Sequence, residues 1–550
     1  MTWWRGAAVY QVYPRSFADA DGDGVGDLAG IESRLPYLRD LGVDALWISP
    51  WYDSPMADGG YDVADYRAID PRFGTLWDAE RLIAAAHAHG LKVIIDIVPN
   101  HTSDRHPWFQ AALAAAPGSP ERARYHFRDA PNNWRSRFGG PAWTRVDDGQ
   151  YYLHLFDTAQ PDLNWDNADV RAEFVSILRF WLDRGVDGFR IDVADRLAKQ
   201  AGLPDRVAPT RAAPDASVPG VGASKPGVPE ATVPTFAGEG PQPDKDQPEV
   251  HDVYREWRRV LDEYPDRAFV GEIWVPDPER FAMYLRPDEL HTAFNFAFLK
   301  CAWEARALRG VIDRTLAAHA PVGAAPTWVL SNHDVTRHAT RYGRADTRFT
   351  KRVHDVPSDP ELGLRRARAA ALLSMALPGS VYIYQGDELG LPEVFDLPDG
   401  SREDPVFRRT GGADLGRDGC RVPLPWGGDA PPFEFGDGGA WLPQPPEWRD
   451  RTAARQLADP ASMLSLYRLA LRLRRDDPAL GDGPMQWLDA PDGVLAFTRG
   501  PRFTCTVNLT DRPIPLPAGK PLIASAPLEP APDSGGAPAL PPDAAAWLRT

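Results

Sequence analysis

Gly188-Phe189-Arg190-Ile191-Asp192 is an apolar run that ends in a carboxylic acid, and the chain repeats this arrangement twice. Glu272 ends the run Phe269-Val270-Gly271-Glu272, and Asp334 closes Leu330-Ser331-Asn332-His333-Asp334. The three acids are far apart in sequence, so only a fold that gathers strand ends could bring them together. A barrel of parallel strands does this, and a cluster of acids is what cleavage of a glycosidic bond requires.

Short apolar runs alternate with amphipathic segments along most of the 550 residues. Strands are predicted at residues 8–13, 45–49, 92–97, 188–192, 269–272, 293–298, 327–331 and 381–384. Helices are predicted at residues 31–41, 76–89, 170–184, 251–264, 301–319, 364–377 and 463–474. This alternation with eight strands predicts an α/β fold, a (β/α)8 TIM barrel.

Two long connections and a change of pattern near the C-terminus divide the chain. Residues 101–169 are rich in Trp, Tyr and Gly and are predicted to form a small folded excursion from a barrel at 1–100 and 170–475. Residues 201–249 are dense in Pro, Ala and Gly, which favours either a surface loop or a lid over the active site. Alternating strand patterns within residues 476–550 predict a small antiparallel β domain.

Charge and cysteine content exclude several classes of protein. The net charge of −16 argues against a nucleic-acid partner. The three cysteines form neither a disulfide framework nor a Cys-x-x-Cys metal pattern. Met1-Thr2-Trp3-Trp4-Arg5 runs straight into the first strand without room for a signal peptide, and no apolar run is long enough to span a bilayer. We therefore expect a cytoplasmic enzyme without a membrane partner.

The neighbours of the acids indicate separate chemical roles. Arg190 and Asp192 share one face of an extended strand, so the guanidinium is expected to lower the pKa of Asp192 and keep a nucleophile ionised. Ile273-Trp274 surrounds Glu272 with apolar and aromatic groups, which suits a general acid.

Polar groups follow two further strands. His333 can donate to a sugar hydroxyl, and Asp334 can stabilise positive charge at an oxocarbenium-like carbon. Asp96 lies at the end of the third strand and is expected to orient its neighbours from underneath, and His101 follows that strand as a neutral donor.

A Gly-rich loop near the N-terminus carries acids at alternate positions: Asp19, Asp21, Asp23 and Asp27, with Val25 between them. The pattern resembles the first half of an EF-hand loop, without its helix and distal Glu. Carboxylates and the Val25 carbonyl would suit a hard cation, Ca²⁺ before Mg²⁺. The alternative is a solvated turn, and we predict a structural ion.

The motifs together resemble the α-amylase family, glycoside hydrolase family 13, and within it the α-glucosidase and oligo-1,6-glucosidase group. The resemblance rests on five segments in order: Asp96-Ile97-Val98-Pro99-Asn100-His101, Gln160-Pro161-Asp162-Leu163-Asn164-Trp165, Gly188-Phe189-Arg190-Ile191-Asp192-Val193, Gly271-Glu272-Ile273-Trp274 and Ser331-Asn332-His333-Asp334. It covers residues 9–474. It implies a barrel domain A, a domain B inserted after the third strand at 101–169, and a C-terminal β-sandwich domain at 476–550.

The resemblance also implies a retaining double displacement. Asp192 would be the nucleophile, Glu272 the acid/base, and Asp334 the stabiliser of the transition state. Retention predicts that the carboxyl groups of Asp192 and Glu272 lie roughly 5–5.5 Å apart.

The sugar subsite is likewise assigned by the resemblance. Tyr61 would stack on the non-reducing glucose, Asp62 would bind its terminal hydroxyls, and Arg417 would pair with that acid and close the pocket. A closed pocket implies an exo-acting enzyme that releases single glucose units. His101, Arg190 and His333 would complete the subsite, and the loop from Asp19 to Asp27 matches the family's Ca²⁺ site.

The residue after the nucleophile predicts which type of glycosidic linkage the enzyme cleaves. In this group Val goes with α-1,6 bonds and Ala or Thr with α-1,4 bonds, so Val193 favours isomaltose-like substrates. The segments around Arg337 and Cys420 look more like α-glucosidases that cleave maltose. We therefore expect a broad α-glucosidase that acts on short α-glucosides, with some transglucosylation, and make no prediction of its oligomeric state.

Three alternatives share the fold. The first is an oligo-1,6-glucosidase with strict α-1,6 preference. The second is glucosyl transfer of the trehalose synthase or sucrose isomerase type, although the sucrose isomerase motif Arg-Leu-Asp-Arg is absent from residues 337–344. The third is a non-catalytic barrel such as the heavy-chain subunits of amino-acid transporters, which have lost the acids that this chain retains.

Overall fold

A computed structural model describes residues 2–206, 242–349, 356–530 and 538–550 and contains the predicted barrel. Eight parallel strands form one sheet in the order β11-β10-β9-β5-β2-β1-β13-β12. They are β1 (Ala8–Val12), β2 (Ala45–Ile48), β5 (Lys92–Ile97), β9 (Gly188–Ile191), β10 (Ala268–Gly271), β11 (Thr292–Ala293), β12 (Thr327–Val329) and β13 (Ser380–Tyr384). Nearly every strand residue is buried, as expected for strands covered on both faces.

The sixth strand is much shorter than predicted. The expected strand at 293–298 is wrong beyond Ala293, because Asn295 caps a short helix, α8 (Phe296–Leu299), through its side chain. The apolar run Phe294–Phe298 therefore reflects burial and not extended backbone. The Asn295 amide donates to the Thr327 carbonyl at 3.2 Å, so a backbone hydrogen bond joins the two ends of the sheet, β11 and β12.

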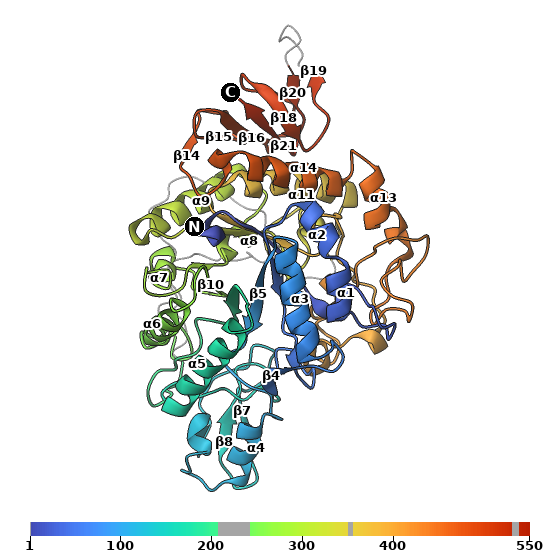
Figure 1. Cartoon of the computed structure of the whole chain (residues 1–550). Coiled ribbons are helices and arrows are strands. Elements are labelled where there is room, and N and C mark those ends of the chain that lie inside the picture. Colours follow the sequence, from blue (N-terminus) through green and yellow to red (C-terminus); the bar gives the residue numbers. More distant parts are fainter. Residues whose placement is uncertain (1, 207–241, 350–355, 531–537) are drawn as a thin grey trace, which may run out of the picture.

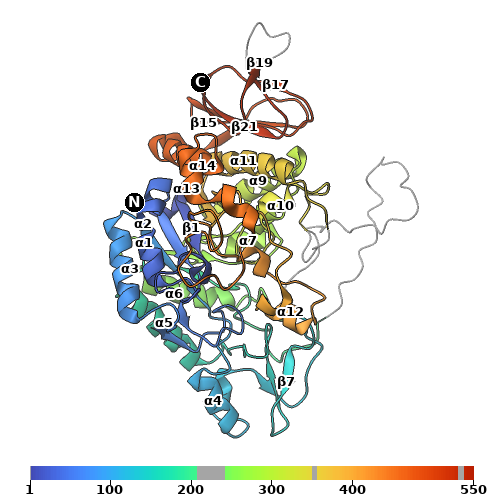
Figure 2. The ribbon, with the colours of Figure 1, turned by 90° about the vertical axis from the view of Figure 1, so that its right-hand side faces the viewer.

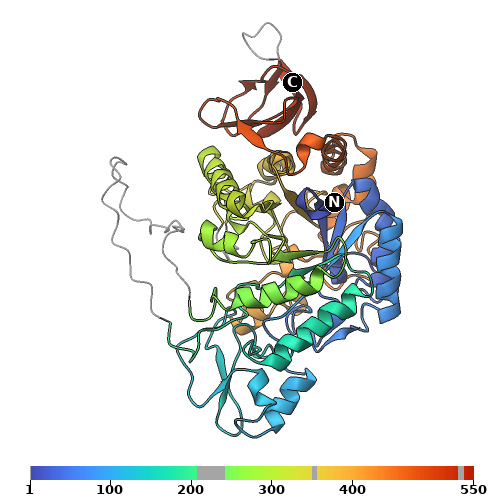
Figure 3. The same ribbon diagram turned by 60° about the vertical axis from the view of Figure 1, so that its left-hand side comes forward.

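Helices surround the sheet, as the teal and green ribbons in Figure 3 show. The predicted helix at 31–41 is two helices, α1 (Leu28–Ser33) and α2 (Leu35–Leu41), because Pro36 lacks the amide donor that a continuous helix needs there and is tolerated only in the first turn of a helix. The others are α3 (Leu76–Ala88), α5 (Ala168–Leu182), α6 (Val250–Leu261), α7 (Pro278–Met283), α9 (Ala305–His319), α10 (His338–Arg341), α11 (Pro360–Ala376), α12 (Pro405–Arg409), α13 (Ala453–Ala458) and α14 (Met463–Asp476).

Two smaller units lie at opposite ends of the barrel (Figure 1). The excursion after β5 contains α4 (Pro107–Ala114) and an antiparallel sheet of β6 (Phe127–Arg128), β8 (Tyr151–Leu153) and β7 (Trp143–Arg145). The C-terminal unit has antiparallel sheets in the orders β14-β15-β16-β21-β18 and β17-β20-β19. These strands are β14 (Met485–Trp487), β15 (Val494–Arg499), β16 (Phe503–Asn508), β17 (Ile514–Pro515), β18 (Lys520–Ala524), β19 (Glu529–Pro530), β20 (Pro538–Leu540) and β21 (Ala544–Arg549).

The predicted loop or lid at residues 201–249 lies mostly outside the described residues, since 207–241 are not described. Its described start packs on the excursion, where the Asn132 side chain donates to the Leu203 carbonyl at 3.0 Å and the Trp134 indole to the Pro204 carbonyl at 2.8 Å. Figure 2 shows the excursion and α12 on the same side of the barrel. In the described part of the chain, no helix combines the length and apolarity needed to cross a membrane.

Candidate active site

Two of the three predicted acids, Asp192 and Glu272, meet Asp96 around one buried guanidinium at the carboxyl ends of β5, β9 and β10. Arg190 donates to Asp96 at 2.6 Å, to Asp192 at 2.9 Å and to Glu272 at 2.6 Å. Parallel strands end at one face of a barrel, so residues separated by 176 positions in sequence share one cation. Asp96 also accepts from the Trp47 indole at 2.9 Å, which places it beneath the site as expected.

The electrostatics of Asp192 differ from the prediction. Burial raises the pKa of Asp192 well above its usual range, and the lowering by Arg190 is outweighed by burial together with the negative charges of Glu272 and Asp96. Arg190 lowers the pKa of Asp192 as expected, but the expectation that it would keep Asp192 ionised is wrong, because the net pKa is raised. One cation among three buried carboxyl groups leaves excess negative charge around Asp192, which favours the neutral form of its side chain.

Glu272 is held by donors on both oxygens. One oxygen accepts from Arg190 and from the Val193 amide at 3.1 Å, and the other accepts from the Trp274 indole at 2.8 Å. Val193 has a φ of 37°, which is unusual for a β-branched residue and turns its amide toward Glu272. Trp274 stacks on Phe296 with ring centroids 4.0 Å apart, which fixes the indole.

Asp334 lies across the site from these carboxyl groups, against two arginines. Arg417 donates to it at 3.0 Å and Arg421 at 3.1 Å. Burial alone would raise the pKa of Asp334, but the neighbouring His333, Arg417 and Arg421 hold it far below its usual range. Asp334 is therefore ionised at neutral pH and can face a developing positive charge.

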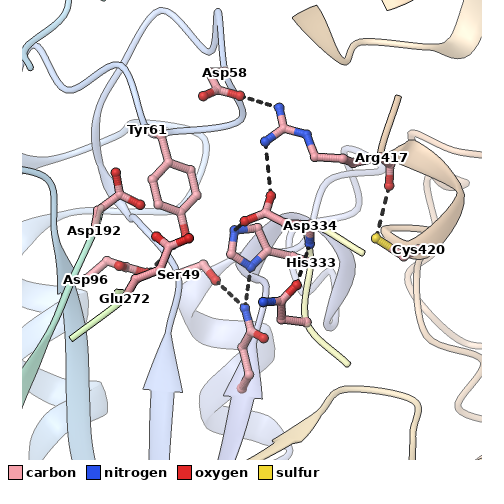
Figure 4. Close-up of polar contacts among 12 residues, drawn as sticks. Ser49, Asp58, Tyr61, Asp96, Asp192, Glu272, His333, Asp334, Arg417 and Cys420 are labelled. Atoms are coloured by element: carbon pink, nitrogen blue, oxygen red, sulfur yellow. Dashed lines mark hydrogen bonds and ion pairs between the residues drawn. The ribbon is translucent and has the colours of Figure 1, made fainter. Parts of the chain in front are cut away.

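Arg417 pairs with Asp58 and not with Asp62, so that part of the prediction is wrong. The Arg417–Asp58 distance is 2.5 Å, and Figure 4 shows Arg417 joining Asp58 to Asp334. The Asp62 side chain is fully buried and accepts from the backbone amides of Ala57 at 2.8 Å and Asp58 at 2.9 Å. Asp62 therefore shapes the loop, and Asp58 presents its carboxylate to the site.

The physical reason lies in the turn that separates the two acids. Gly59 and Gly60 adopt φ angles of 59° and 101°, which glycine permits and which reverse the chain between Asp58 and Tyr61. The same turn directs Tyr61 into the site, where its hydroxyl contacts Asp96 at 3.2 Å.

The aromatic rings of Tyr61 and His333 pack face to face at one side of the site. Tyr61 and His333 are stacked at 5.2 Å with an interplanar angle of 3°. Burial lowers the pKa of His333 to about 3 and that of His101 to about 4, so both imidazoles are neutral, as predicted for His101. The His333 Nε2 is buried without a hydrogen-bond partner among the described residues and lies 3.3 Å from Asp334.

Several residues of this site were not predicted from the sequence. Gln160 donates to Asp58 at 3.1 Å, Gln11 contacts the His333 Nδ1 at 2.7 Å, and Asp404 holds the Arg417 guanidinium. Gln160 lies within a quoted motif and Arg421 directly follows Cys420, so their positions were available as signals. Gln11 is an internal strand residue, and nothing in its pattern indicates that it faces the site.

The loop from Asp19 to Asp27 gathers three of its acids. Ligand atoms of Asp19, Asp21 and Asp27 lie within 4.8 Å of one another, a spacing that suits a hard cation with carboxylate ligands. Asp23 accepts from the Val25 amide at 2.7 Å and is not part of this group. Burial and the neighbouring acids raise the pKa of Asp19, so the loop concentrates negative charge that a cation would offset.

The fold and the acids at its strand ends define a (β/α)8 enzyme with the carboxyl groups that glycoside hydrolysis uses. The family model for the α-amylase catalytic domain matches residues 11–483. The chain therefore belongs to the α-amylase family of glycoside hydrolases.

Known proteins similar to this chain agree with this assignment. A probable α-glucosidase of Rhizobium meliloti (strain 1021) is 39% identical over 92% of this chain and 90% of its own length. An oligo-1,6-glucosidase of Heyndrickxia coagulans is 34% identical over 90% of each chain. The crystal structure of an α-glucosyl transfer enzyme, XgtA, matches with a TM-score of 0.85 and 38% identity, covering 100% of this chain and 99% of that chain.

Proposed function

We propose that the protein is a retaining, exo-acting α-glucosidase that releases glucose from the non-reducing end of short α-glucosides. The observation that carries the proposal is the Arg190 cluster, which joins Asp192 and Glu272 through one guanidinium. Relatives named α-glucosidase and oligo-1,6-glucosidase support the substrate class.

In the proposed mechanism, Asp192 attacks the anomeric carbon while Glu272 gives a proton to the departing glycosidic oxygen. In this step Asp192 acts as the carboxylate and Glu272 as the carboxylic acid. Asp334 stays ionised and stabilises the positive charge that develops on the sugar ring. Water then attacks the glucosyl–Asp192 ester with Glu272 as base, which restores the original configuration.

The exo action is inferred from the ion pair between Arg417 and Asp58. The pair spans one end of the site at 2.5 Å, beside the stacked Tyr61 and His333. We infer that Tyr61 supports the face of the terminal glucose, and that Asp58, His101, Arg190, His333 and Arg417 bind its hydroxyls. A longer chain at that end would have to break the pair.

A second candidate is glucosyl transfer to a sugar acceptor, and the similarity to an α-glucosyl transfer enzyme favours it. Both activities share the glucosyl–enzyme step and differ in whether water or a sugar takes the glucose. We propose that Val193, which contacts Glu272 through its amide, sets the preference between α-1,4 and α-1,6 bonds.

We also propose a structural Ca²⁺ bound by Asp19, Asp21, Asp23, Asp27 and the Val25 carbonyl. The convergence of three of these acids supports it. A Ca²⁺ ion would tie the loop after β1 to the start of α1, where Asp27 caps the helix through the Gly30 amide at 2.6 Å. The cytoplasmic location stays a prediction of the sequence.

A substrate panel tests the function. Purified protein is given maltose, isomaltose, sucrose, trehalose and nitrophenyl α-glucoside, and the products are followed by NMR. We expect glucose that first appears as the α-anomer. First release of the β-anomer contradicts retention, and new disaccharides in place of glucose from maltose or sucrose favour the transfer candidate.

A further inference from the structure

A groove lined by arginines lies on the outside of the barrel between α2 and α14, which are neighbours in Figures 1 and 2. Its volume is about 370 Å³. The charged lining residues are Arg39, Asp40, Arg468, Arg472 and Arg475, so four cations face one anion. This local excess of positive charge stands out in a chain whose net charge is −16.

Two of the arginines are fixed by the end of α2. Arg468 donates from Nε to the Asp40 carbonyl at 3.1 Å, and Arg475 donates to the Val43 carbonyl at 3.4 Å. Arg475 also forms an ion pair with Asp44 at 3.9 Å, so Asp40 and Asp44 together leave the four arginines with a net charge of about +2. A guanidinium has five N–H donors, so these contacts orient both side chains and leave donors for a ligand. Such pre-orientation reduces the entropy lost on binding.

Arg472 stands apart from the other three. Among the residues that the structure describes, no hydrogen bond or ion pair joins it to a partner, and it is exposed one helical turn from Arg468. Arg39, by contrast, is paired with the Asp40 carboxylate at 2.9 Å, which offsets its charge. Arg472 therefore contributes an uncompensated cation to the groove.

The close contact of the two helices gives the groove its floor. Gly42 follows α2 with a φ of 102°, and a Cβ added to it would lie 3.2 Å from the Leu471 Cβ. The turn after α2 therefore packs directly against α14. Leu41 and Leu469 line the groove between the arginines, so an apolar surface adjoins the charged one.

We propose that this groove binds an anion that carries a phosphate group, with the phosphate on the guanidinium groups and an organic part over Leu469. Guanidinium groups match phosphate oxygens with paired N–H donors, and the net positive lining suits a dianion. The volume exceeds what a phosphate group alone fills, which favours a phosphorylated small molecule over the inorganic ion. This site is separate from the proposed glucosidase site and does not depend on it.

Calorimetric titration of the full chain tests the proposal at fixed ionic strength, with inorganic phosphate, a hexose monophosphate and sodium chloride as titrants. We expect both phosphates to bind, the hexose monophosphate more tightly, and chloride to give no signal. Arg472→Glu is expected to weaken phosphate binding at least tenfold, and the milder Arg472→Gln less.

The matched control is Arg306→Glu, which makes the same charge change at a side chain that is 82% exposed on α9, away from the groove. Retained glucosidase activity shows that each variant is folded. Equal phosphate binding in Arg472→Glu and Arg306→Glu would overturn the proposal, as would a response to phosphate no greater than that to chloride. Equal affinity for inorganic phosphate and the hexose monophosphate would contradict the proposal that an organic part of the ligand contributes to binding.

Discussion

Arg190 is the residue on which the site depends most, because a single buried guanidinium holds three carboxyl groups from three strands. Removing one partner from such a cluster leaves an uncompensated buried charge. The free-energy cost of that charge is larger than the net stability that the ion pair contributes. The geometry of the acids is therefore set before substrate binds.

Trp274 gives a prediction about proton donation. Trp274→Phe removes the indole N–H from Glu272 and keeps a ring on Phe296. General acid catalysis matters most for a poor leaving group, so kcat on maltose should fall by about tenfold and kcat on nitrophenyl α-glucoside much less. Equal losses on both substrates would show that Trp274 does not aim the acid.

Asp58 and Asp62 give a prediction that separates the structure from the sequence. Asp58→Ala removes the partner of Arg417 and should lower kcat/KM on maltose by about 100-fold with little change in Tm. Asp62→Ala leaves the buried Asp58 amide and the part-buried Ala57 amide without an acceptor, and should lower the unfolding free energy by about 1–3 kcal/mol for the buried one. Steady-state kinetics and thermal melts of both variants test this prediction. A large loss of stability in Asp58→Ala together with a large loss of kcat/KM in Asp62→Ala would contradict these roles.

At the residue scale, the sequence predicted the three acids, Arg190 and His333 because each lies at or near a strand end in a motif, and Arg417 because the family resemblance assigned it. It could not separate Asp58 from Asp62, since the choice depends on the backbone between them. Nor could it predict the pKa of Asp192, because burial and the sharing of Arg190 among three acids are three-dimensional properties.

At the scale of elements, the turn after β9 carries strain and charge together. Val193 has positive φ, and Asp195 follows with both carboxyl oxygens buried and without hydrogen-bond partners in the described ranges. Burial raises the pKa of Asp195 to about 7, although Lys245 opposes the shift. The sequence predicted this strand end correctly, whereas periodicity could not distinguish the short β11 from the buried α8.

Asp195 makes stability depend on pH. Between about pH 4 and 7 the folded protein keeps the Asp195 proton that the unfolded chain has lost, so this group lowers the unfolding free energy as pH rises, by about 1.4 kcal/mol per pH unit. Asp195→Asn should therefore be more stable than the native protein at pH 8 and similar at pH 4. Chemical denaturation at both pH values checks this, and equal stabilities at pH 8 would refute it.

At the scale of the whole molecule, the barrel brings distant strand ends together while the excursion and the C-terminal sheets lie at its two ends (Figure 1). The order of strands and helices predicted this arrangement, because eight alternations allow few topologies. The groove between α2 and α14 could not be predicted, since its arginines come from segments more than 400 residues apart.

The Ca²⁺ proposal predicts a change in global stability. A hundredfold excess of Ca²⁺ over its Kd would add about 2.7 kcal/mol to the unfolding free energy, so EDTA should lower Tm by several degrees. Asp21→Asn, which removes an exposed member of the group, should melt at the same temperature with Ca²⁺ and with EDTA. If the Tm of the native protein is the same with Ca²⁺ and with EDTA, the proposed Ca²⁺ site is contradicted.

The central claim is that Asp192 is the nucleophile of a retaining α-glucosidase, and chemical rescue of Asp192→Gly tests it most directly. The variant should hydrolyse nitrophenyl α-glucoside more than about 10⁴-fold more slowly. Added azide should enter the vacated space, restore release of nitrophenol and give β-glucosyl azide, identified by NMR. Near-native hydrolysis by the folded variant, or rescue that yields α-glucosyl azide, would contradict the claim.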